Sequence, residues 1–414
     1  MISVQYWQKF GHNGVYIIVI CLPSLQTYSK FGNTYSRNLY SAVNNYPLLH
    51  VLWFSWRDTK HPHAGGAEVF AHEVMRRLVN KGHNVTLFCA RFPNSPPFET
   101  IDGVKLVRDG NTYTVYDKAK GYYKKYGSKY DLIVDENNTK PFLTPKFIKD
   151  KPILALCHSL TKEGWFYETF FPLNFIGYYF LETKWLSYYI HTPTAVVSES
   201  TKSDLEALGF KRLFLVPEGL SVTPLNEVPK RQSDPIVIFI GRLKRHKMPD
   251  HAIRAFSIIK DAFPTAKMWI IGEGYLRKEL EKLKIKDLTF FGRVTEDVKY
   301  DLMRKAHLVL VPAVREGWGL VVTECNAMGV PAVAYDIPGL RDSVKDGKTG
   351  ILVEKNSPES LADAAISLLK DKALLSKLSS EALLYSRQFS WDNTANEFNK
   401  IINILCSASV CLGR

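Results

Sequence analysis

Short, uninterrupted apolar runs recur along this chain, and stretches with a helical spacing of apolar residues lie between them. A strand that is apolar on both faces is typical of a parallel sheet covered by helices on both sides. The alternation of such strands with helices therefore predicts an α/β architecture of doubly wound sheets. The expected strands cover residues 48–54, 85–89, 104–107, 132–134, 153–157, 195–197, 213–216, 236–240, 267–271, 288–291, 308–311, 332–334 and 351–353.

The length of 414 residues exceeds what one hydrophobic core usually serves, so two domains are expected. Residues 221–235 are polar and carry three prolines, which is typical of a boundary between domains. We therefore expect a first domain over residues 48–220 and a second over residues 221–390. The cleft between two such facing domains is the default ligand site.

Residues 1–47 lie outside this pattern. They are rich in Tyr, Asn and Ser, and no acidic residue precedes Asp58. We interpret them as an N-terminal extension, either disordered or the product of a reading frame that starts too early. The alternative is an extra strand over residues 16–22 at the edge of the first sheet.

Charge and cysteine content limit the partners and the compartment. The chain carries 54 Lys and Arg against 41 Asp and Glu, a net charge of +13, which favours nucleic acid, an anionic membrane surface or a phosphorylated ligand. Its six cysteines form no Cys-x-x-Cys pair and mostly lie in apolar stretches, which indicates a reducing compartment. The apolar run 15–22 is too short to cross a membrane and lacks signal-peptide features. These observations predict a cytoplasmic protein.

A glycine-rich turn from Arg315 to Glu324 follows the apolar run 308–312 and leads into an expected helix over residues 321–328. At such a junction, unpaired N–H groups and the helix dipole suit an anionic group such as a diphosphate. Glu316 and Glu324 flank the turn with seven residues between them, and carboxylates accept hydrogen bonds from sugar hydroxyls. The turn therefore indicates a nucleotide-sugar site. The same pattern also occurs as a plain strand-turn-helix with solvated glutamates.

Three further groups follow expected strands, at the edge where open α/β sheets bind ligands. Gly65 and Gly66 open a helix in the first domain, although tight turns need glycine for steric reasons as well. His158 follows a strand directly, where it either contacts a bound hydroxyl or merely caps the strand. Arg242 and Lys247 lie in the first turn of the second domain, where they either hold one phosphate pair or form a basic surface loop.

Two aromatic stretches have roles that the sequence leaves open. Residues 116–130 interleave lysines with tyrosines, which favours a solvated helix face over a contact for phospholipid headgroups. Nucleic acid is a third option, but no recognisable nucleic-acid module accompanies the patch. Residues 165–189 are rich in aromatic side chains and are interrupted by charges, so they do not span a bilayer. Packing against the first domain is favoured for them over a place in a membrane interface.

Several short motifs occur along the chain in a definite order: Gly65-Gly66-Ala67-Glu68, His158, Ser198-Glu199-Ser200, Val216-Pro217-Glu218-Gly219, Gly241-Arg242-Leu243 with Lys247, Gly272-Glu273-Gly274, Gly292-Arg293-Val294 and Glu316 to Glu324. In this order they resemble the retaining glycosyltransferases of family four, also called group one, and the resemblance covers about His50 to about Asn399. It implies the GT-B fold, in which two Rossmann-like domains face one another across a ligand cleft. It also implies that a last helix, here residues 391–405, packs back on the first domain.

The resemblance further implies a role for each site residue. Arg242 and Lys247 would hold the diphosphate of the donor and stabilise its charge as it leaves. Glu316 would bind hydroxyls of the sugar, Glu324 the ribose, and His158 the transferred sugar. Further contacts with the donor are implied for Gly65, Gly66, Gly241, Gly292, Arg293, Val294, Gly317, Trp318, Gly319 and Leu320.

The implied activity is transfer of a hexose from a nucleotide-diphosphate sugar to a glycan or a lipid-linked saccharide, with retention of configuration. No Asp-x-Asp metal signature is apparent, so we expect neither a metal nor another cofactor. Met248 stands where many members of the family have glycine, which bears on the identity of the donor, and Glu218 stands where Asn is frequent. The rival interpretations are a nucleotide-sugar-binding protein without activity, a nucleotide-dependent oxidoreductase and a basic nucleic-acid-binding protein. We expect no nucleic-acid partner, and a peripheral contact with the cytoplasmic face of an anionic membrane.

Overall fold

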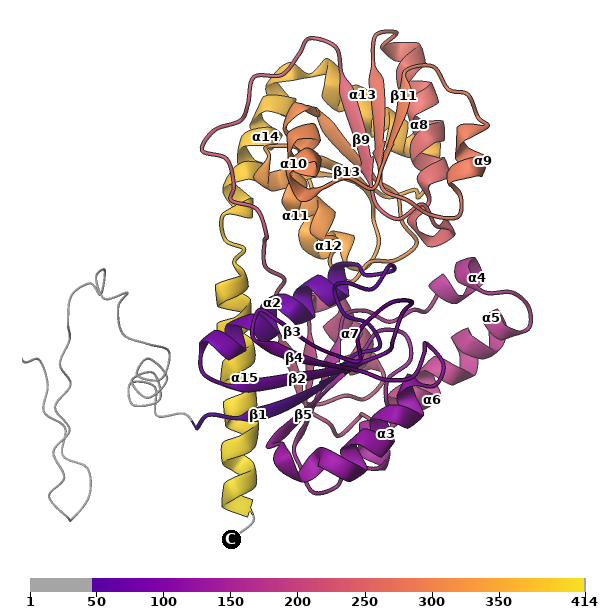
Figure 1. The fold of residues 1–414 in the computed structure, drawn as a ribbon. Coiled ribbons are helices and arrows are strands. Elements are labelled where there is room, and N and C mark those ends of the chain that lie inside the picture. Colours follow the sequence, from indigo (N-terminus) through magenta and orange to yellow (C-terminus); the bar gives the residue numbers. More distant parts are fainter. Residues whose placement is uncertain (1–46, 413–414) are drawn as a thin grey trace, which may run out of the picture. The chain divides into compact units, whose positions relative to one another are not determined.

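The computed structural model describes residues 47–412, and their side chains through residue 407. Figure 1 shows the chain as a ribbon, with two sheets that follow one another in sequence. The predictions made for the N-terminal extension, including the strand over residues 16–22, fall on residues outside the described range. Cys89, Cys157, Cys325 and Cys406 are free and buried.

The first sheet has eight strands in the order β3-β4-β2-β1-β5-β6-β7-β8. All neighbours pair in parallel except β3, which pairs with β4 in antiparallel fashion at the sheet edge. The strands are β1 (His50–Phe54), β2 (Asn84–Cys89), β3 (Phe98–Ile101), β4 (Val104–Arg108), β5 (Leu132–Asn137), β6 (Ile153–Cys157), β7 (Thr194–Val196) and β8 (Leu213–Leu215). The sequence did not predict β3, because its four residues alternate between half-buried and exposed positions and form no apolar run.

Helices cover both faces of the first sheet. One face carries α2 (Gly66–Asn80) and the last helix, α15 (Trp391–Leu412), whose side chains share one buried cluster with β1. Residues of α3 (Val115–Tyr126) pack on the other face, and α6 (Glu182–Ser187) and α7 (Glu199–Ala207) continue that layer. The remaining elements of this half are α4 (Gly164–Glu168), α5 (Leu173–Ile176), a single π-helical turn η3 (Gly177–Leu181), and two short 3₁₀ turns, η1 (Gly127–Lys129) and η2 (Thr144–Lys146).

The second sheet has six strands, all parallel, in the order β11-β10-β9-β12-β13-β14. They are β9 (Ile236–Ile240), β10 (Lys267–Ile271), β11 (Leu288–Gly292), β12 (Leu308–Val311), β13 (Ala332–Tyr335) and β14 (Gly350–Val353). The helices around them are η4 (Arg245–Lys247), α8 (Pro249–Ala262), α9 (Arg277–Glu281), α10 (Glu296–Lys305), α11 (Leu320–Ala327), α12 (Leu340–Ser343), α13 (Pro358–Lys370) and α14 (Lys372–Ser386). The doubly wound α/β class that the apolar runs predicted is confirmed.

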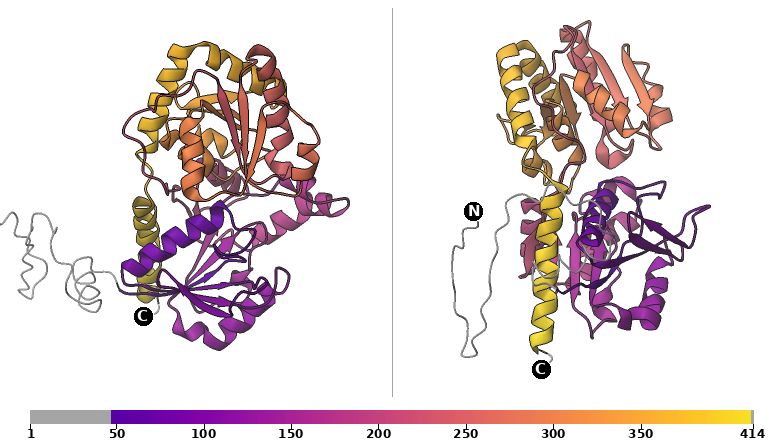
Figure 2. Two further views of the ribbon diagram at one scale, coloured as in Figure 1. Left: turned by 45° about the horizontal axis from the view of Figure 1, so that its top comes forward. Right: turned by 60° about the vertical axis from the view of Figure 1, so that its left-hand side comes forward.

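After α14 the chain returns to the first sheet through α15, which lies beside α2 in Figure 2. The ring of Phe398 stacks on Trp53 of β1, with 5.2 Å between the ring centroids. Trp391 lies against Gly219, where a Cβ atom would come within 2.3 Å of the indole, so only glycine fits at this crossing. Within the described residues, no helix is long and apolar enough to cross a membrane.

Candidate functional site

The glycine-rich turn after β12 leads directly into α11. Gly319 precedes the helix with φ +94°, a backbone conformation that favours glycine over any residue with a Cβ atom. Gly317 lies against the backbone of the first domain, because a Cβ atom there would come within 2.6 Å of the carbonyl oxygen of His158. The two glycines thus bring the start of α11, with its unpaired N–H groups, to the carboxyl end of β6.

Cationic side chains gather in front of this turn. Lys247, at the end of η4, forms an ion pair with Glu316, and both side chains are mostly buried. Arg242 follows β9, and its guanidinium lies 4.0 Å from the position that a Cβ atom would take at Gly65. Arg57, from the loop after β1, forms a buried ion pair of 2.7 Å with Glu68. Burial lowers the pKa of Arg57, and the nearby charge of Arg242 adds to that effect.

Glu324 lies one turn inside α11 and faces a lysine of α10. Its Oε1 accepts hydrogen bonds from Lys299 Nζ at 3.0 Å and from the hydroxyl of Tyr300 at 3.3 Å. Burial raises the pKa of Glu324, and the charge of Lys299 offsets part of the rise. Glu324 therefore presents a carboxylate whose charge is balanced within the protein.

A second group of ionisable residues surrounds His158 on the first sheet. Its Nε2 lies 3.1 Å from Glu136 Oε1, and Phe70 packs edge-on against the ring at 5.2 Å. Burial favours the neutral ring, but the hydrogen bond and charge of Glu136, together with the charges of Glu218 and Glu68, raise the pKa of His158. Burial raises the pKa of Glu218 to about 7, a rise that His158 limits. Within the part of the chain that the structure describes, neither His158 Nδ1 nor Glu218 Oε2 has a hydrogen-bond partner.

A cavity of about 320 Å³, here called the central cavity, joins these groups. It brings together most of the site residues that the sequence singled out. These lining residues are Gly65, Gly66, His158, Gly241, Arg242, Lys247, Glu316, Gly317, Trp318, Gly319 and Leu320. The Trp318 ring itself packs on Phe389 at 5.5 Å and is buried, so the backbone of this residue is the part that can meet a ligand.

Two further cavities adjoin the central cavity. The outer cavity, about 370 Å³, shares Arg57, Arg242, Lys247 and Glu316 with it and extends to Trp165 on α4. The rear cavity, about 690 Å³, lies behind Gly66 and Leu320 and contains Glu324, Lys299 and Tyr300. Gly292 ends β11 and is followed by Arg293 and Val294, and these three residues line none of the three cavities.

Sequence reasoning missed several residues of the site. Arg57, Glu136 and Asn138 were not singled out, although Arg57 and Asn138 line the central cavity and Glu136 holds His158. A signal was available for Glu136, because the run Asp135-Glu136-Asn137 places polar residues directly after an apolar strand. Lys299 and Tyr300 lie on a polar helix, and no motif marked them.

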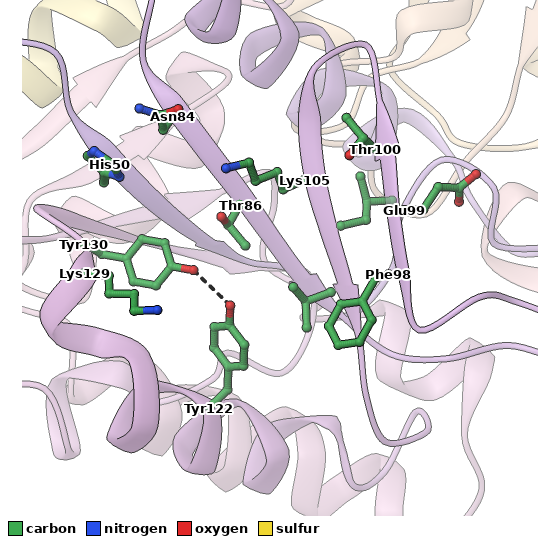
Figure 3. Close-up of a pocket in the computed structure, with 12 residues that line it drawn as sticks. His50, Asn84, Thr86, Phe98, Glu99, Thr100, Lys105, Tyr122, Lys129 and Tyr130 are labelled. Atoms are coloured by element: carbon green, nitrogen blue, oxygen red, sulfur yellow. Dashed lines mark hydrogen bonds between the residues drawn. The ribbon is translucent and has the colours of Figure 1, made fainter.

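A wider cavity, about 720 Å³, lies away from this site and contains none of the predicted site residues. It lies where β1 and β2 begin, and its walls include β3, β4 and the region of α3 and η1 (Figure 3). The hydroxyls of Tyr122 and Tyr130 are hydrogen-bonded at 2.9 Å on one side of it (Figure 3). Open α/β sheets bind ligands at the opposite ends of their strands, so this cavity is not the candidate site.

Comparisons with known protein families match both halves of the chain. The model described as Glycosyltransferase Family 4 matches residues 64–223, and the model described as Glycosyl transferases group 1 matches residues 225–384. Together these ranges take in well over half of the sequence.

Individual relatives and solved structures agree with these matches. A D-inositol 3-phosphate glycosyltransferase from Rhodococcus jostii is 33% identical over 173 residues, which are 39% of this chain and 38% of the relative. The match thus spans about two fifths of that relative's length. Sucrose-phosphate synthase from Thermosynechococcus elongatus superposes with a TM-score of 0.71 at 21% identity, over 87% of this chain and 100% of that one. HepE from Anabaena, solved in complex with UDP-glucose, superposes with a TM-score of 0.65 at 15% identity, over 86% of this chain and 99% of that one. These structures have the same GT-B fold.

Proposed function

This chain belongs to the group 1 glycosyltransferases of family 4, and from that premise we propose that it transfers a hexose from a nucleotide-diphosphate sugar to a saccharide acceptor. The observation that carries the proposal is the central cavity, in which Arg242 and Lys247 face the glycine turn at the start of α11. Two cations and a helix N-terminus are a strong arrangement for a diphosphate.

The charges of the site support a leaving-group role for the diphosphate. As the bond to the sugar breaks, negative charge grows on the diphosphate, and fixed cations stabilise that charge more than they stabilise the ground state. Lys247 already pairs with Glu316, which orients the ammonium group before the donor binds. We therefore propose that the reaction needs no metal ion. Arg242 and Lys247 supply the charge instead.

The remaining donor contacts follow from the positions of the carboxylates. Glu316 lies beside Lys247 in the central cavity, where it can accept hydrogen bonds from sugar hydroxyls. Glu324 lines the rear cavity, where it suits the ribose, and the size of that cavity leaves room for a base. His158 contacts the transferred sugar from the side of the first sheet. We propose that a phosphate oxygen of the leaving group takes the proton of the acceptor, with retention of configuration.

The outer cavity is our candidate acceptor site. It opens beside the central cavity, and its lining by the half-buried Trp56 together with Glu168 and Lys244 combines an aromatic side chain with charged groups, as saccharide sites often do. We propose a glycan or a lipid-linked saccharide as the acceptor, and a protein that works at the cytoplasmic face of a membrane.

Donor titration tests the proposal. Wild type and Glu316→Ala are titrated by calorimetry with UDP-, GDP- and ADP-sugars in EDTA, beside Glu397→Ala, which removes an exposed carboxylate from an ion pair with Lys400. We expect one nucleotide class to bind wild type and Glu397→Ala alike, and Glu316→Ala to bind the sugar nucleotide about tenfold more weakly. Binding of no donor by wild type would overturn the proposal. Donor binding without any turnover in the presence of glycan acceptors would favour a non-catalytic binding protein.

A further inference from the structure

The aromatic segment of the first half is more exposed than its sequence suggested. Packing was favoured for residues 165–189, and Trp165, Leu186 and Tyr189 are indeed buried. The part between them is not. Its exposed apolar side chains, here called the aromatic surface, are Phe166, Tyr167, Phe170, Phe171, Leu173, Phe175, Ile176, Tyr179 and Phe180. Phe170, Phe171 and Phe180 are 83%, 79% and 68% exposed, which is rare for three phenylalanines within so short a stretch.

Ring contacts link Phe166, Phe171, Phe175 and Tyr179 of this surface. Phe166 contacts Phe175 at 5.3 Å, and Phe175 contacts Phe171 at 6.1 Å and Tyr179 at 5.8 Å between ring centroids. They lie on α4, on the loop between α4 and α5, on α5 and on η3, a segment that projects from the edge of the first half in Figure 1 and in the left view of Figure 2. A contiguous exposed apolar patch of this kind marks a surface that something covers.

The charges around the patch indicate what covers it. Each carboxylate of the segment is engaged elsewhere: Glu163 lies 3.3 Å from Arg315, Glu168 lies 2.5 Å from His246, and buried Glu182 accepts hydrogen bonds from backbone N–H groups. Exposed cations lie close by instead. Arg245 belongs to η4, which packs on α4, and Lys146 lies 4.7 Å from the ring of Tyr188, which follows α6 at the end of the aromatic segment.

We propose that the aromatic surface inserts into the headgroup region of an anionic membrane, and that the acceptor is therefore a lipid-linked saccharide. Exposed apolar rings together with cationic side chains are the composition that binds at such an interface, and the net charge of +13 favours the same surface. The segment starts at the acceptor side of the site, since Gly164, Trp165, Glu168 and Thr169 line the outer cavity. A lipid-linked saccharide then reaches that cavity while its chains stay in the bilayer. This inference rests on the proposed function for the identity of the acceptor, but not for the membrane contact.

Vesicle flotation tests the surface. Full-length wild type, Phe170→Ser/Phe180→Ser and Phe98→Ser are floated with phosphatidylcholine vesicles and with mixed phosphatidylcholine–phosphatidylglycerol vesicles. Phe98 is 71% exposed on β3, so it is a matched control outside the aromatic surface. We expect wild type and Phe98→Ser to float with the mixed vesicles, and the double variant to bind at least about tenfold more weakly. High salt should weaken binding without abolishing it, because only the cationic part is screened.

Donor titration on the same samples separates this inference from the proposed function. All three proteins should bind the nucleotide sugar alike, because Phe170 and Phe180 lie outside the central and rear cavities. Equal flotation of wild type and the double variant would overturn the proposal, as would a wild type that binds no vesicles. Concentration-dependent dimerisation that only the double variant loses, without vesicle binding, would assign the surface to a second copy of the chain and would also overturn it. If wild type floats with vesicles but binds no nucleotide sugar, the membrane contact is supported and the proposed transferase function is wrong.

Discussion

In the second half of the chain, Glu316 on the turn after β12 and Glu324 on α11 pair with Lys247 and Lys299, respectively. In the first half, Glu218 on the loop after β8 is buried with an oxygen that has no partner among residues 47–412, and its pKa is raised to about 7. Both sets of carboxylates border the same group of cavities. The second half thus pairs both of these carboxylates with lysines, whereas the first half holds, beside its own Arg57–Glu68 ion pair, a buried carboxyl whose pKa is raised to about 7.

This difference leads us to expect different roles for the two groups of carboxylates that border the cavities. Paired charges cost little reorganisation when a charged donor arrives, which suits the binding of a diphosphate. A buried carboxyl next to a histidine responds to pH and to the arrival of a hydroxyl or a charge. We therefore expect changes in the second half of the chain to act on donor turnover and binding, and changes at Glu218 to act on pH dependence.

The largest effect is expected for Lys247→Ala. Without the ammonium group, the growing charge of the diphosphate loses a fixed partner, and kcat for donor hydrolysis should fall about 100- to 1000-fold. The matched control is Lys348→Ala, which removes a lysine that is 62% exposed and lies 3.8 Å from Glu381. Steady-state kinetics with the donor that binds best measures both. If kcat of Lys247→Ala is within twofold of the wild-type value, the proposed role of the paired charges in donor turnover is wrong.

The next largest effect concerns Glu218 and pH. Because its pKa is raised from an ordinary 4.5 to about 7, the native state holds a proton that the unfolded state has lost, and stability falls as pH rises through this range. In wild type this group should remove about 2 to 3 kcal/mol of unfolding free energy between pH 5 and 8. Glu218→Gln has no carboxyl to titrate. Its unfolding free energy, measured relative to that of wild type, should therefore rise by about 2 to 3 kcal/mol between pH 5 and 8.

Urea unfolding at several pH values measures this difference. Glu227→Gln, at an exposed position of the boundary segment, is the control and should follow wild type at every pH. If the free-energy difference between Glu218→Gln and wild type is the same at pH 5 and pH 8, Glu218 does not titrate as described.

A smaller effect is expected for Glu324→Ala. The variant loses the carboxylate proposed for the ribose and leaves Lys299 without its partner on α11, so the Kd for the nucleoside diphosphate should rise about 10- to 100-fold. Calorimetry with the bare nucleoside diphosphate isolates this contact from the sugar. An unchanged Kd would place the ribose elsewhere and remove Glu324 from the donor site.

The smallest effect is expected at Trp318, in the second half of the chain. Trp318 Nε1 is buried and has no hydrogen-bond partner in the described part of the chain, so Trp318→Phe should change stability by less than about 1 kcal/mol. Trp391→Phe is the matched control, because it removes a hydrogen bond of 3.0 Å to Ser221 and should cost about 1 kcal/mol. A larger loss for Trp318→Phe than for Trp391→Phe in urea unfolding would show that its indole is bonded in solution.

Sequence reasoning succeeded where neighbouring residues determine the structure, and it failed where contacts between separate segments determine it. Apolar runs located β6, β9, β10 and β12 to the residue, because these strands are buried on both faces and their ends coincide with turn residues. The motifs placed Arg242, Lys247 and Glu316, whose geometry depends on local turns. They did not find Arg57 or Glu136, because Arg57 meets Glu68, and Glu136 meets His158, through contacts between separate elements that no local motif records. Nor does a list of aromatic residues reveal which rings point outward, since that depends on how α4, α5 and η3 fold together.

We propose that cations of the protein, rather than a metal ion, carry the charge of the leaving diphosphate. The most direct test of this proposal is the steady-state turnover of the preferred nucleotide sugar by wild type in excess EDTA and again in excess Mg²⁺. We predict that kcat and KM agree within about twofold between the two conditions, because Arg242 and Lys247 supply the charge in both. Turnover that disappears in EDTA and returns with Mg²⁺ would contradict this account.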